Sequence, residues 1–189
     1  MESFVDEFNE QARSKSGAPV IAVDGLSGAG KDTVASFVSE RFGVRHISAS
    51  DAFYEIAEER DLSETELSAQ AGKEVDLEID RRTLQKALSG PCVIDSRIAA
   101  HVLGTYADLR IRVKADLEER ARRLGERDGI GSPVPHVRTR DREDSRRYQE
   151  YYGIDTSDLS VYHLVLDNTD VGVKPQNRII ESVVENTVM

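Results

Sequence analysis

The stretch Gly25-Leu26-Ser27-Gly28-Ala29-Gly30-Lys31-Asp32-Thr33 decides which fold this sequence predicts. It directly follows residues 20–23, a continuously apolar run that is typical of a strand buried on both faces. Apolar residues at helical spacing come after it and end at Gly43. A glycine-rich turn in this position lets backbone N–H groups point inward beside the positive end of a helix. The stretch therefore predicts a phosphate-binding loop, since a tight turn with chance glycines would not explain the strand and helix that flank it.

The same stretch supplies candidate ligands for a nucleotide and its metal ion. Lys31 can reach the β- and γ-phosphates of ATP, and we expect it to be catalytic. The usual form of the loop has Ser or Thr after the lysine, where the hydroxyl binds Mg²⁺, but Asp32 and then Thr33 stand here. Either of these two could bind the metal, and Asp24, before the loop, could be structural or could face the γ-phosphate. The expected nucleotide-binding residues are Gly25, Ser27, Gly28, Ala29, Gly30, Lys31, Asp32 and Thr33.

Short apolar runs alternate with helical patterns through the rest of the chain. Further strands are expected at residues 44–47, 92–94, 109–113 and 162–166. Helices are expected within residues 51–88, 117–124 and 137–152 and from Pro175, as a first helical position, to residue 184. Strands that alternate with helices predict an α/β fold with a mostly parallel sheet flanked by helices.

Two local patterns indicate where helices begin. Ser63 with Glu66, and Asp116 with Glu119, have the spacing of a capping box, in which each side chain bonds the other residue's backbone N–H. We therefore expect a helix to open at each of these two pairs.

One domain is the simplest division of this chain. It spans residues 19–189 and follows an N-terminal extension, residues 1–18, to which we assign no chemistry. Two helical excursions, residues 51–88 and 129–153, are longer than usual connections. We expect the first to bind an acceptor and the second to act as a lid.

Composition restricts the classes of protein that fit. The chain has 189 residues, of which 39% are hydrophobic and 32% charged, as in a soluble globular protein. No apolar run approaches the ~20 residues that span a bilayer, and the acidic N-terminus does not resemble a secretory signal. The single cysteine, Cys92, lies in an apolar run, which favours a buried thiol. We expect a cytoplasmic monomer that has no membrane partner.

Charge patterning points to a small anion rather than to nucleic acid. The formal net charge is −10, which disfavours non-specific binding to DNA or RNA. Between residues 120 and 147, however, nine arginines outnumber five acids. Arg140, Asp144 and Arg147 are spaced i, i+4 and i+7, so they share one face of the expected helix. Phosphoryl transfer needs positive charge and the exclusion of water, which such a lid would supply, although a solvated helix with salt bridges has a similar pattern.

Polar residues also follow the expected strand at residues 92–94. Ligands of parallel sheets lie beyond the carboxyl ends of the strands, where Asp95 could hold Mg²⁺ through water and Arg97 could bind an acceptor phosphate. A helix cap at Asp95 or Ser96 with a surface arginine is the alternative. Ser50 and Asp51 open the acceptor excursion and are expected to bind substrate.

At this point the sequence resembles the cytidylate kinases, especially the short form common in archaea, within the nucleoside monophosphate kinase group. The resemblance spans about residues 19–187. The segments that carry it are residues 25–33, 46–53, 78–82, 95–97, 140–148, 152–155 and 158–162. The loop is generic to the group, whereas the arginine-rich run and the run Tyr152-Gly153-Ile154-Asp155 are more specific.

The resemblance implies a five-stranded parallel sheet of the adenylate-kinase type, with ATP and Mg²⁺ as donor and CMP or dCMP as acceptor. By position, Arg97 would bind the acceptor phosphate, and Arg140 and Arg147 would contact phosphates across the transfer site. Asp144 would contact the acceptor's sugar, and residues 168–169 would lie near the donor base. The sequence departs from the family at Asp32, at Asp95, where Glu is frequent, and at Ser96, where Gly is usual.

Three alternatives remain open on the sequence. One is another small P-loop kinase, of the adenylate, deoxynucleotide or dephospho-coenzyme A type. The adenylate type typically has an Asp-Gly-Phe-Pro-Arg-like run where this chain has Asp95-Ser96-Arg97-Ile98. A GTPase-like switch is disfavoured because Val113 stands where its guanine motif needs Asn. A nucleotide-binding protein without turnover is the third.

Overall fold

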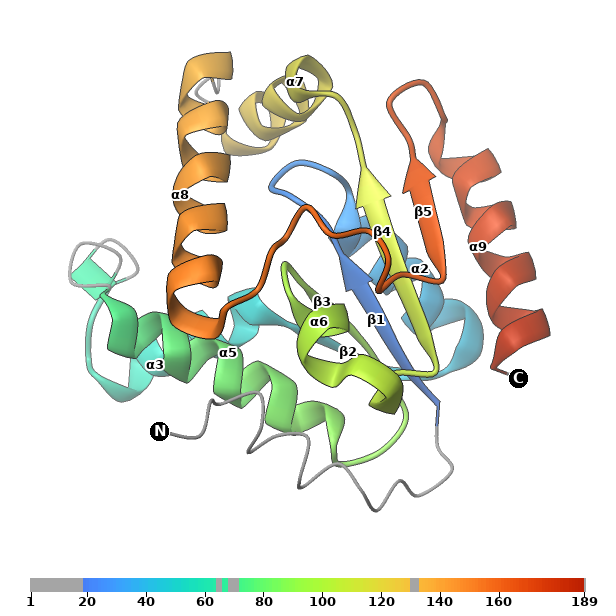
Figure 1. Cartoon of the computed structure of the whole chain (residues 1–189), viewed down its shortest axis with the longest axis horizontal. Coiled ribbons are helices and arrows are strands. Elements are labelled where there is room, and N and C mark those ends of the chain that lie inside the picture. Colours follow the sequence, from blue (N-terminus) through green and yellow to red (C-terminus); the bar gives the residue numbers. More distant parts are fainter. Residues whose placement is uncertain (1–18, 64–65, 68–71, 130–132, 189) are drawn as a thin grey trace.

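A computed structural model describes residues 19–63, 66–67, 72–129 and 133–188. Its centre is a sheet of five parallel strands in the order β2-β3-β1-β4-β5 (Figure 1). The strands are β1 (Val20–Asp24), β2 (Arg45–Ser48), β3 (Cys92–Ser96), β4 (Leu109–Lys114) and β5 (Leu164–Asp167). The predicted α/β class with a five-stranded parallel sheet is therefore confirmed. The expected N-terminal extension lies outside the described residues.

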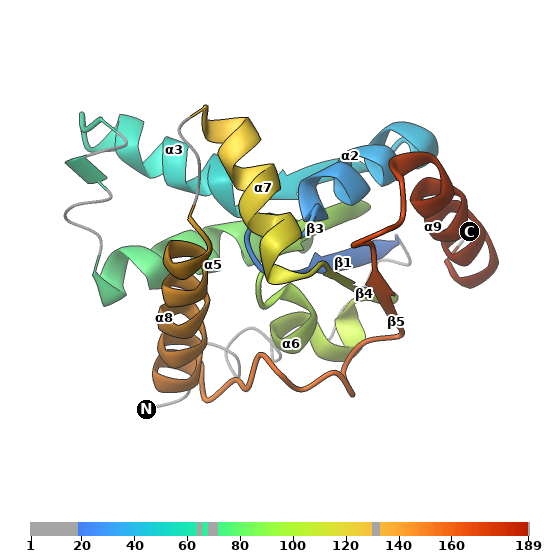
Figure 2. The ribbon, with the colours of Figure 1, turned by 90° about the horizontal axis from the view of Figure 1, so that it is seen from above.

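Helices cover both faces of this sheet, as the view from above shows (Figure 2). They are α2 (Lys31–Phe42), α3 (Ala49–Glu59), α5 (Lys73–Ala87), α6 (Ala99–Leu103), α7 (Leu117–Asp128), α8 (Val134–Tyr152) and α9 (Val173–Thr187), with a 3₁₀ turn at Gly104–Tyr106. Alternate residues of β1 face opposite layers. Ile21 and Val23 pack with α2 and α9, whereas Val20 and Ala22 pack with α5 and α6.

The central position of β1 fixes where the phosphate loop emerges. Every residue of β1 is buried, and the strand pairs with β3 on one side and β4 on the other. Its apolar residues are between 0 and 2% exposed, so the hydrophobic effect holds the strand in place from both faces. The loop that follows β1 therefore starts from the most constrained strand of the sheet.

The two helical excursions are present as helices, with boundaries that differ from the expected ones. The acceptor excursion contains α3 and α5, which pack against each other around Ile56 and Val75. The lid helix α8 begins at Val134 rather than near residue 137, because Pro135 lies in its first turn, where a helix needs no N–H from it. For the same reason α9 begins at Val173, so the prediction that Pro175 is its first residue was wrong.

One predicted capping box is confirmed and the other is wrong. Ser63 N–H donates to the carboxylate of Glu66, and Glu66 N–H donates to the Ser63 hydroxyl. Glu119, in contrast, pairs with two arginines of its own helix, and the Asp116 side chain makes no capping bond.

Three smaller findings complete the comparison with the sequence. Cys92 is fully buried, as predicted. The short helix α6 was not predicted, because five residues give too little periodicity to recognise. The last strand begins at Leu164 and not at Tyr162, whose side chain turns into the core instead. In the part of the chain that the structure describes, no helix combines the length and the apolarity required to span a membrane.

Candidate active site

The loop between β1 and α2 has a shape that requires glycine. Gly28 and Gly30 have φ values of +78° and +91°, in the left-handed region that favours glycine. A Cβ at Gly28 would lie 2.7 Å from the carbonyl oxygen of Arg120, so the loop is also pressed against α7. Gly30 caps α2 without a side chain, which leaves the first N–H groups of that helix available to an anion.

Lys31 is the first residue of α2 and faces the main cavity. It lines a cavity of about 530 Å³ beyond the carboxyl ends of β1 and β3. Burial lowers the pKa of its ammonium group to about 8, although Asp95 and Asp24 favour the charged form. An anionic ligand in the cavity would raise this pKa again.

The cavity brings together the loop, the acceptor excursion and the lid helix. Its lining residues are Ser27, Gly28, Lys31, Ser48, Ala49, Ser50, Phe53, Tyr54, Asp76, Ile79, Asp80, Asp95, Ser96, Arg97, Arg127, Arg140, Arg147, Tyr148 and Tyr151. Among the predicted substrate residues, Ser50 and Arg97 are on this lining. Asp51 is an exposed residue of α3 and Asp144 is buried, and neither belongs to the lining.

Four arginines converge on this one cavity. Arg97 follows β3, Arg127 belongs to α7, and Arg140 and Arg147 belong to α8. Burial and the other three arginines lower the pKa of Arg140. Like charges at this density repel one another, so the cavity favours a ligand with several negative charges.

Asp144 holds two of these arginines in place. It is 2% exposed, its Oδ2 lies 2.8 Å from Nη1 of Arg97, and its Oδ1 pairs with Nη2 of Arg147. Arg147 also contacts Asp76 of α5 at 2.5 Å. The predicted common face of Arg140, Asp144 and Arg147 therefore points inward, with the carboxylate behind the guanidinium groups. The alternative interpretation, a solvated helix with salt bridges, applies only to the opposite face of α8.

Arg120 links the phosphate loop to the lid helix. Its Nη1 donates to the carbonyl of Ser27 at 3.1 Å, and both Nη atoms bond the carboxylate of Asp141 in α8, at 3.1 and 2.7 Å. Arg97 Nη2 donates in addition to the Ser27 hydroxyl at 2.8 Å. Sequence reasoning missed Arg120, because its partners lie 21 and 93 residues away in the chain.

Three residues at this end of the sheet could hold a metal ion. Asp32, His46 and Asp95 each offer one ligand atom, and these atoms all lie within 4.8 Å of one another. Nε2 of His46 is 2.6 Å from Oδ2 of Asp95, and this contact raises the pKa of the imidazole. Carboxylate oxygens suit Mg²⁺, so the donor set fits the metal that the sequence predicted. Thr33, the other predicted ligand, lines a different cavity.

His46 was missed because only the sheet brings it to Asp95. The two residues lie on the adjacent strands β2 and β3, where Ser48 is opposite Asp95. Ser96 has the capping role that the alternative interpretation gave it, since its hydroxyl accepts from the N–H groups of Ile98 and Ala99.

Asp24 has structural contacts in this conformation. It is fully buried, and its Oδ2 accepts hydrogen bonds from Ala100 N–H and from the Tyr162 hydroxyl, both at 3.0 Å. Burial raises the pKa of this carboxyl to about 6. Of the two roles left open by the sequence, the contacts favour the structural one.

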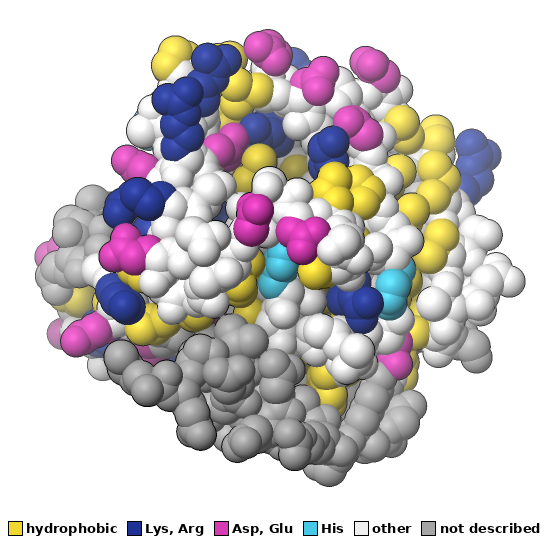
Figure 3. Space-filling view, viewed as in Figure 1, with side chains coloured by type: hydrophobic (Ala, Val, Ile, Leu, Met, Phe, Trp, Pro, Cys, Tyr) yellow, Lys and Arg dark blue, Asp and Glu magenta, His cyan; other side chains and the backbone are white. Residues whose placement is uncertain are grey.

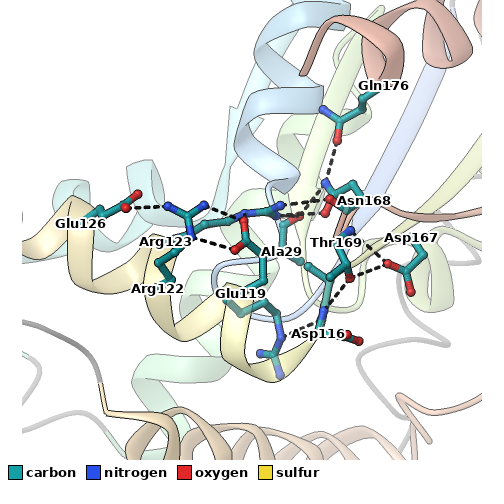
Figure 4. A network of polar contacts seen from close by, with 12 residues as sticks. Ala29, Asp116, Glu119, Arg122, Arg123, Glu126, Asp167, Asn168, Thr169 and Gln176 are labelled. Carbon is teal, nitrogen blue, oxygen red and sulfur yellow. Dashed lines mark hydrogen bonds and ion pairs between the residues drawn. The ribbon is translucent and has the colours of Figure 1, made fainter. Parts of the chain in front are cut away.

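A second cavity, of about 490 Å³, lies on the other side of the phosphate loop. Thr33, Arg123, Asn168, Thr169 and Gln176 are among its lining residues. Figure 4 shows the polar network at its edge: Arg123 Nη1 donates to Asn168 Oδ1 at 2.9 Å, and Asn168 Nδ2 donates to the Ala29 carbonyl at 3.1 Å. The network joins α7, the loop after β5 and the phosphate loop. Asn168 and Thr169 thus lie beside the loop that is expected to bind the donor.

The chain is similar to known proteins over most of its length. Residues 20–170 match the model of the cytidylate kinase-like family. Cytidylate kinase from Methanocaldococcus jannaschii is 39% identical over 174 residues, which cover 88% of this chain and 98% of that protein. Cytidylate kinase from Methanopyrus kandleri is 42% identical over 163 residues, with 79% and 84% covered.

Solved structures of low identity share the fold. Shikimate kinase from Acinetobacter baumannii, in complex with shikimate, has a TM-score of 0.61 and 16% identity, and the likeness covers 91% of this chain and 96% of that one. The protein TT1252 from Thermus thermophilus has a TM-score of 0.58 and 19% identity, with 90% and 98% covered. Together with the family match and the archaeal relatives, which agree with the resemblance seen in the sequence, these findings show that the chain belongs to the cytidylate kinase-like family.

Proposed function

We propose that the protein transfers the γ-phosphate of ATP to CMP or dCMP, which yields ADP and the nucleoside diphosphate. The observation that carries the proposal is the convergence of Lys31 and four arginines on one cavity beside a glycine-shaped phosphate loop. Relatives named cytidylate kinase, at 39 and 42% identity, support the choice of acceptor. We also propose that the enzyme acts on small nucleotides in the cytoplasm, as a monomer.

The acceptor's own chemistry explains why arginines dominate this site. The attacking group is a phosphate oxygen of CMP, which is already ionised at neutral pH, so no residue has to remove a proton. What remains is to bring two anionic groups into line and to stabilise the charge that spreads over the transferred phosphoryl group. Lys31, Arg140 and Arg147 would neutralise that charge and Arg97 would hold the acceptor phosphate, which their shared position on the cavity lining supports.

Asp144 and Arg120, which do not line the cavity, hold the arginines and the phosphate loop in position. Asp144 pairs with Arg97 and Arg147 from behind, so both guanidinium groups are fixed before a ligand arrives. Arg120 fixes the loop carbonyl of Ser27 and the lid helix together. Because these groups are already in position, they do not have to reorganise during the reaction. Such preorganisation is the main source of electrostatic catalysis.

The metal site is part of the proposal. Asp32 and Asp95 would hold Mg²⁺, with His46 as an additional nitrogen donor. When bound, the ion neutralises charge on the β- and γ-phosphates. The donor nucleotide's base would lie in the second cavity, between Arg123 and residues 168–169.

An ADP-release assay tests the proposal. ATP and Mg²⁺ are offered with CMP, dCMP, UMP, AMP, GMP and dTMP in turn, to the wild type, to Lys31→Ala and to Lys174→Ala. Lys174 is an exposed residue of α9, outside both cavities, and provides a matched control. We expect turnover with CMP or dCMP that Lys174→Ala retains and Lys31→Ala loses by at least ~100-fold.

Other results would change the assignment in defined ways. Turnover with another nucleotide alone would keep the reaction and discard the cytidine acceptor. ATP binding without turnover on any of the six nucleotides would overturn the proposed activity and favour a nucleotide-binding protein.

A further inference from the structure

The main cavity is chemically divided along the lid helix. Arg140, near the start of α8, lies on the lining together with the phosphate loop, whereas Tyr148 and Tyr151, near its end, lie there together with α5. A rise of 1.5 Å per residue separates Arg140 from Tyr151 by about 16 Å along the helix. Figure 1 shows α8 running from the region of α7 to α5. The cavity therefore offers arginines for phosphates and, at the end beside α5, tyrosine rings on which a base could pack, with Arg97 close to Tyr148 between the two.

Three carboxylates line this cavity, and two of them are already matched by a basic partner. Asp95 contacts His46, and Asp76 contacts Arg147 at 2.5 Å. Asp80 instead accepts a hydrogen bond from the neutral hydroxyl of Tyr152, at 2.7 Å. Tyr152 does not line the cavity, so it fixes the Asp80 carboxylate without occupying the ligand's space. None of the phosphate-binding roles uses Asp80, because a carboxylate repels phosphate.

Asp80 also lies at the end of the cavity that suits the base. It belongs to α5, next to Ile79 on the lining, and Tyr148 of α8 lines the same end. Asp80 is only 8% exposed, so water competes weakly for its oxygens. Burial raises the pKa of this carboxyl to about 7, and a donor from the ligand beside its remaining lone pairs would favour the ionised form.

Nucleobases differ in what they offer to such an acceptor. Cytosine carries an exocyclic amino group, which donates, at the position where uracil and thymine carry a carbonyl oxygen, which accepts. A carboxylate opposite the amino group gains a charge-assisted hydrogen bond, whereas opposite the carbonyl it leaves two acceptors facing each other.

We propose that Asp80 recognises the exocyclic amino group of the acceptor base, so that the site takes an amino-bearing base and rejects a keto base. The inference rests on the proposed function and adds to it a residue that determines specificity. Since adenine also carries an exocyclic amino group, this contact distinguishes amino from keto bases rather than pyrimidines from purines.

The test compares kcat/KM for CMP and UMP in the wild type, Asp80→Asn and Glu78→Gln. The asparagine oxygen can still accept from Tyr152 while its NH₂ group donates to the uracil carbonyl. We expect the CMP-to-UMP ratio to fall by at least ~10-fold in Asp80→Asn. Glu78, on the same helix, pairs with Arg60 and Arg82 and does not line the cavity, so Glu78→Gln should keep the wild-type ratio.

Two further measurements keep the test decisive. Calorimetric binding of CMP and UMP without ATP should show the same change in ratio, which separates recognition from catalysis. Tyr152→Phe keeps the Asp80 carboxylate but removes the hydroxyl that orients it, so the CMP-to-UMP ratio should fall by a smaller factor. This variant tests the proposal even if Asp80→Asn does not fold.

The outcomes separate this inference from the proposed function. An unchanged ratio in a folded Asp80→Asn or Tyr152→Phe variant, or a wild type that uses CMP and UMP equally, would overturn the role of Asp80 and leave the kinase assignment intact. A wild type without turnover would overturn the kinase assignment, and the binding ratios would then decide the role of Asp80.

Discussion

Asp32 is the residue at which this chain departs most clearly from the usual phosphate loop. A carboxylate replaces the hydroxyl that commonly binds the metal, and it lies close to His46 and Asp95. We expect Asp32→Asn to raise the Mg²⁺ concentration for half-maximal activity by at least ~10-fold, because the amide keeps the shape but loses the charge. Asp32→Thr, which restores a hydroxyl, should recover part of the loss.

A magnesium titration of the steady-state rate measures this effect. Glu40→Gln is the matched control, since Glu40 is an exposed acid of the same helix and lies outside the cluster. The same magnesium requirement in the wild type and Asp32→Asn would assign the metal to other residues, with Thr33 as the first to examine.

Asp24 gives a prediction about pH at the same scale. Burial raises the pKa of its carboxyl from 3.8 to about 6 in the folded state. Below pH 4 both the folded and the unfolded states hold the proton, so Asp24 contributes nothing to the pH dependence. Between pH 4 and 6 the unfolded state releases its proton first, and stability falls as pH rises, by about 3 kcal/mol at most. Asp24→Asn stays neutral, so its free energy of unfolding should rise relative to that of the wild type when the pH is raised from 4.5 to 8.

Denaturant unfolding at these two pH values checks the prediction. Asp167→Asn is the control, because hydrogen bonds from Thr169 lower the pKa of Asp167 and its stability relative to wild type should be the same at both pH values. The stability that this pKa shift provides is present at pH 8 and is lost as pH falls below the ordinary aspartate pKa. An equal loss of stability in Asp24→Asn at both pH values would contradict the prediction. It would mean that the Asp24 carboxyl is ionised and paired with a positive charge in the native protein at both pH values.

Single residues also mark the limit of what the sequence reveals. The spacing of Arg140, Asp144 and Arg147 predicted a shared face, but not that the acid would lie behind the arginines. His46 and Asp80 lie in segments that carry the family resemblance but had no role assigned, because the contacts of the first depend on strand register and those of the second on how α5 packs against α8. Contacts across such distances belong to tertiary structure, which a local pattern does not encode.

At the scale of elements, Arg120 joins three of them. Its side chain is 6% exposed and bonds both the phosphate loop and Asp141 of the lid helix. We expect Arg120→Met to lower the free energy of unfolding by about 3 kcal/mol, because Asp141 then loses its partner in a largely buried place. Activity should fall as well, since the loop and the lid helix are no longer coupled.

A double-mutant cycle with Asp141→Asn isolates this contact. The double variant should be more stable than the sum of the two single effects predicts, since the second change removes the unpaired charge. Additive effects in urea unfolding would show that Arg120 acts through packing alone. The exposed pair Arg146–Glu150 on the same helix is the control, and its removal should cost no more than about 0.5 kcal/mol.

Element types were more predictable than element limits. Short apolar or alternating runs identified all five strands, and the clearest signals were those of β1 and β3, which are buried along their whole length. The helix starts near Pro135 and Pro175 were placed one or more residues wrongly, since proline is tolerated throughout the first turn. Glu119 was assigned to a cap, although arginines one turn away competed for it successfully.

For the whole molecule, the contrast between its charge and its cavity has a kinetic effect. The chain carries a formal charge of −10, while its main cavity is lined by Lys31 and four arginines. On the face shown in Figure 3, Lys and Arg side chains gather over the upper part of α8, and side chains of both charges are spread over the rest. An incoming nucleotide therefore meets repulsion at long range and attraction at short range.

Salt should act on these two ranges differently. At about 0.01 M salt the Debye length is ~30 Å and the whole charge is felt, whereas at about 0.1 M it is ~10 Å and the cavity dominates. We expect the association rate of CMP to rise between these concentrations and to fall again near 1 M. Stopped-flow binding measures the rate, and a rate that falls steadily over the entire range would contradict the prediction.

The arginine cluster also has a consequence for evolution. Ion pairs with Asp144 and Asp76 offset only part of the repulsion among the four arginines, so the cavity is the place where stability and activity make opposite demands. Mutations that increase the stability of the folded protein would replace these arginines first, and each replacement would reduce turnover. The cluster can persist only under selection for what it binds, which makes its presence in a chain of this family a sign that the chain still works as an enzyme.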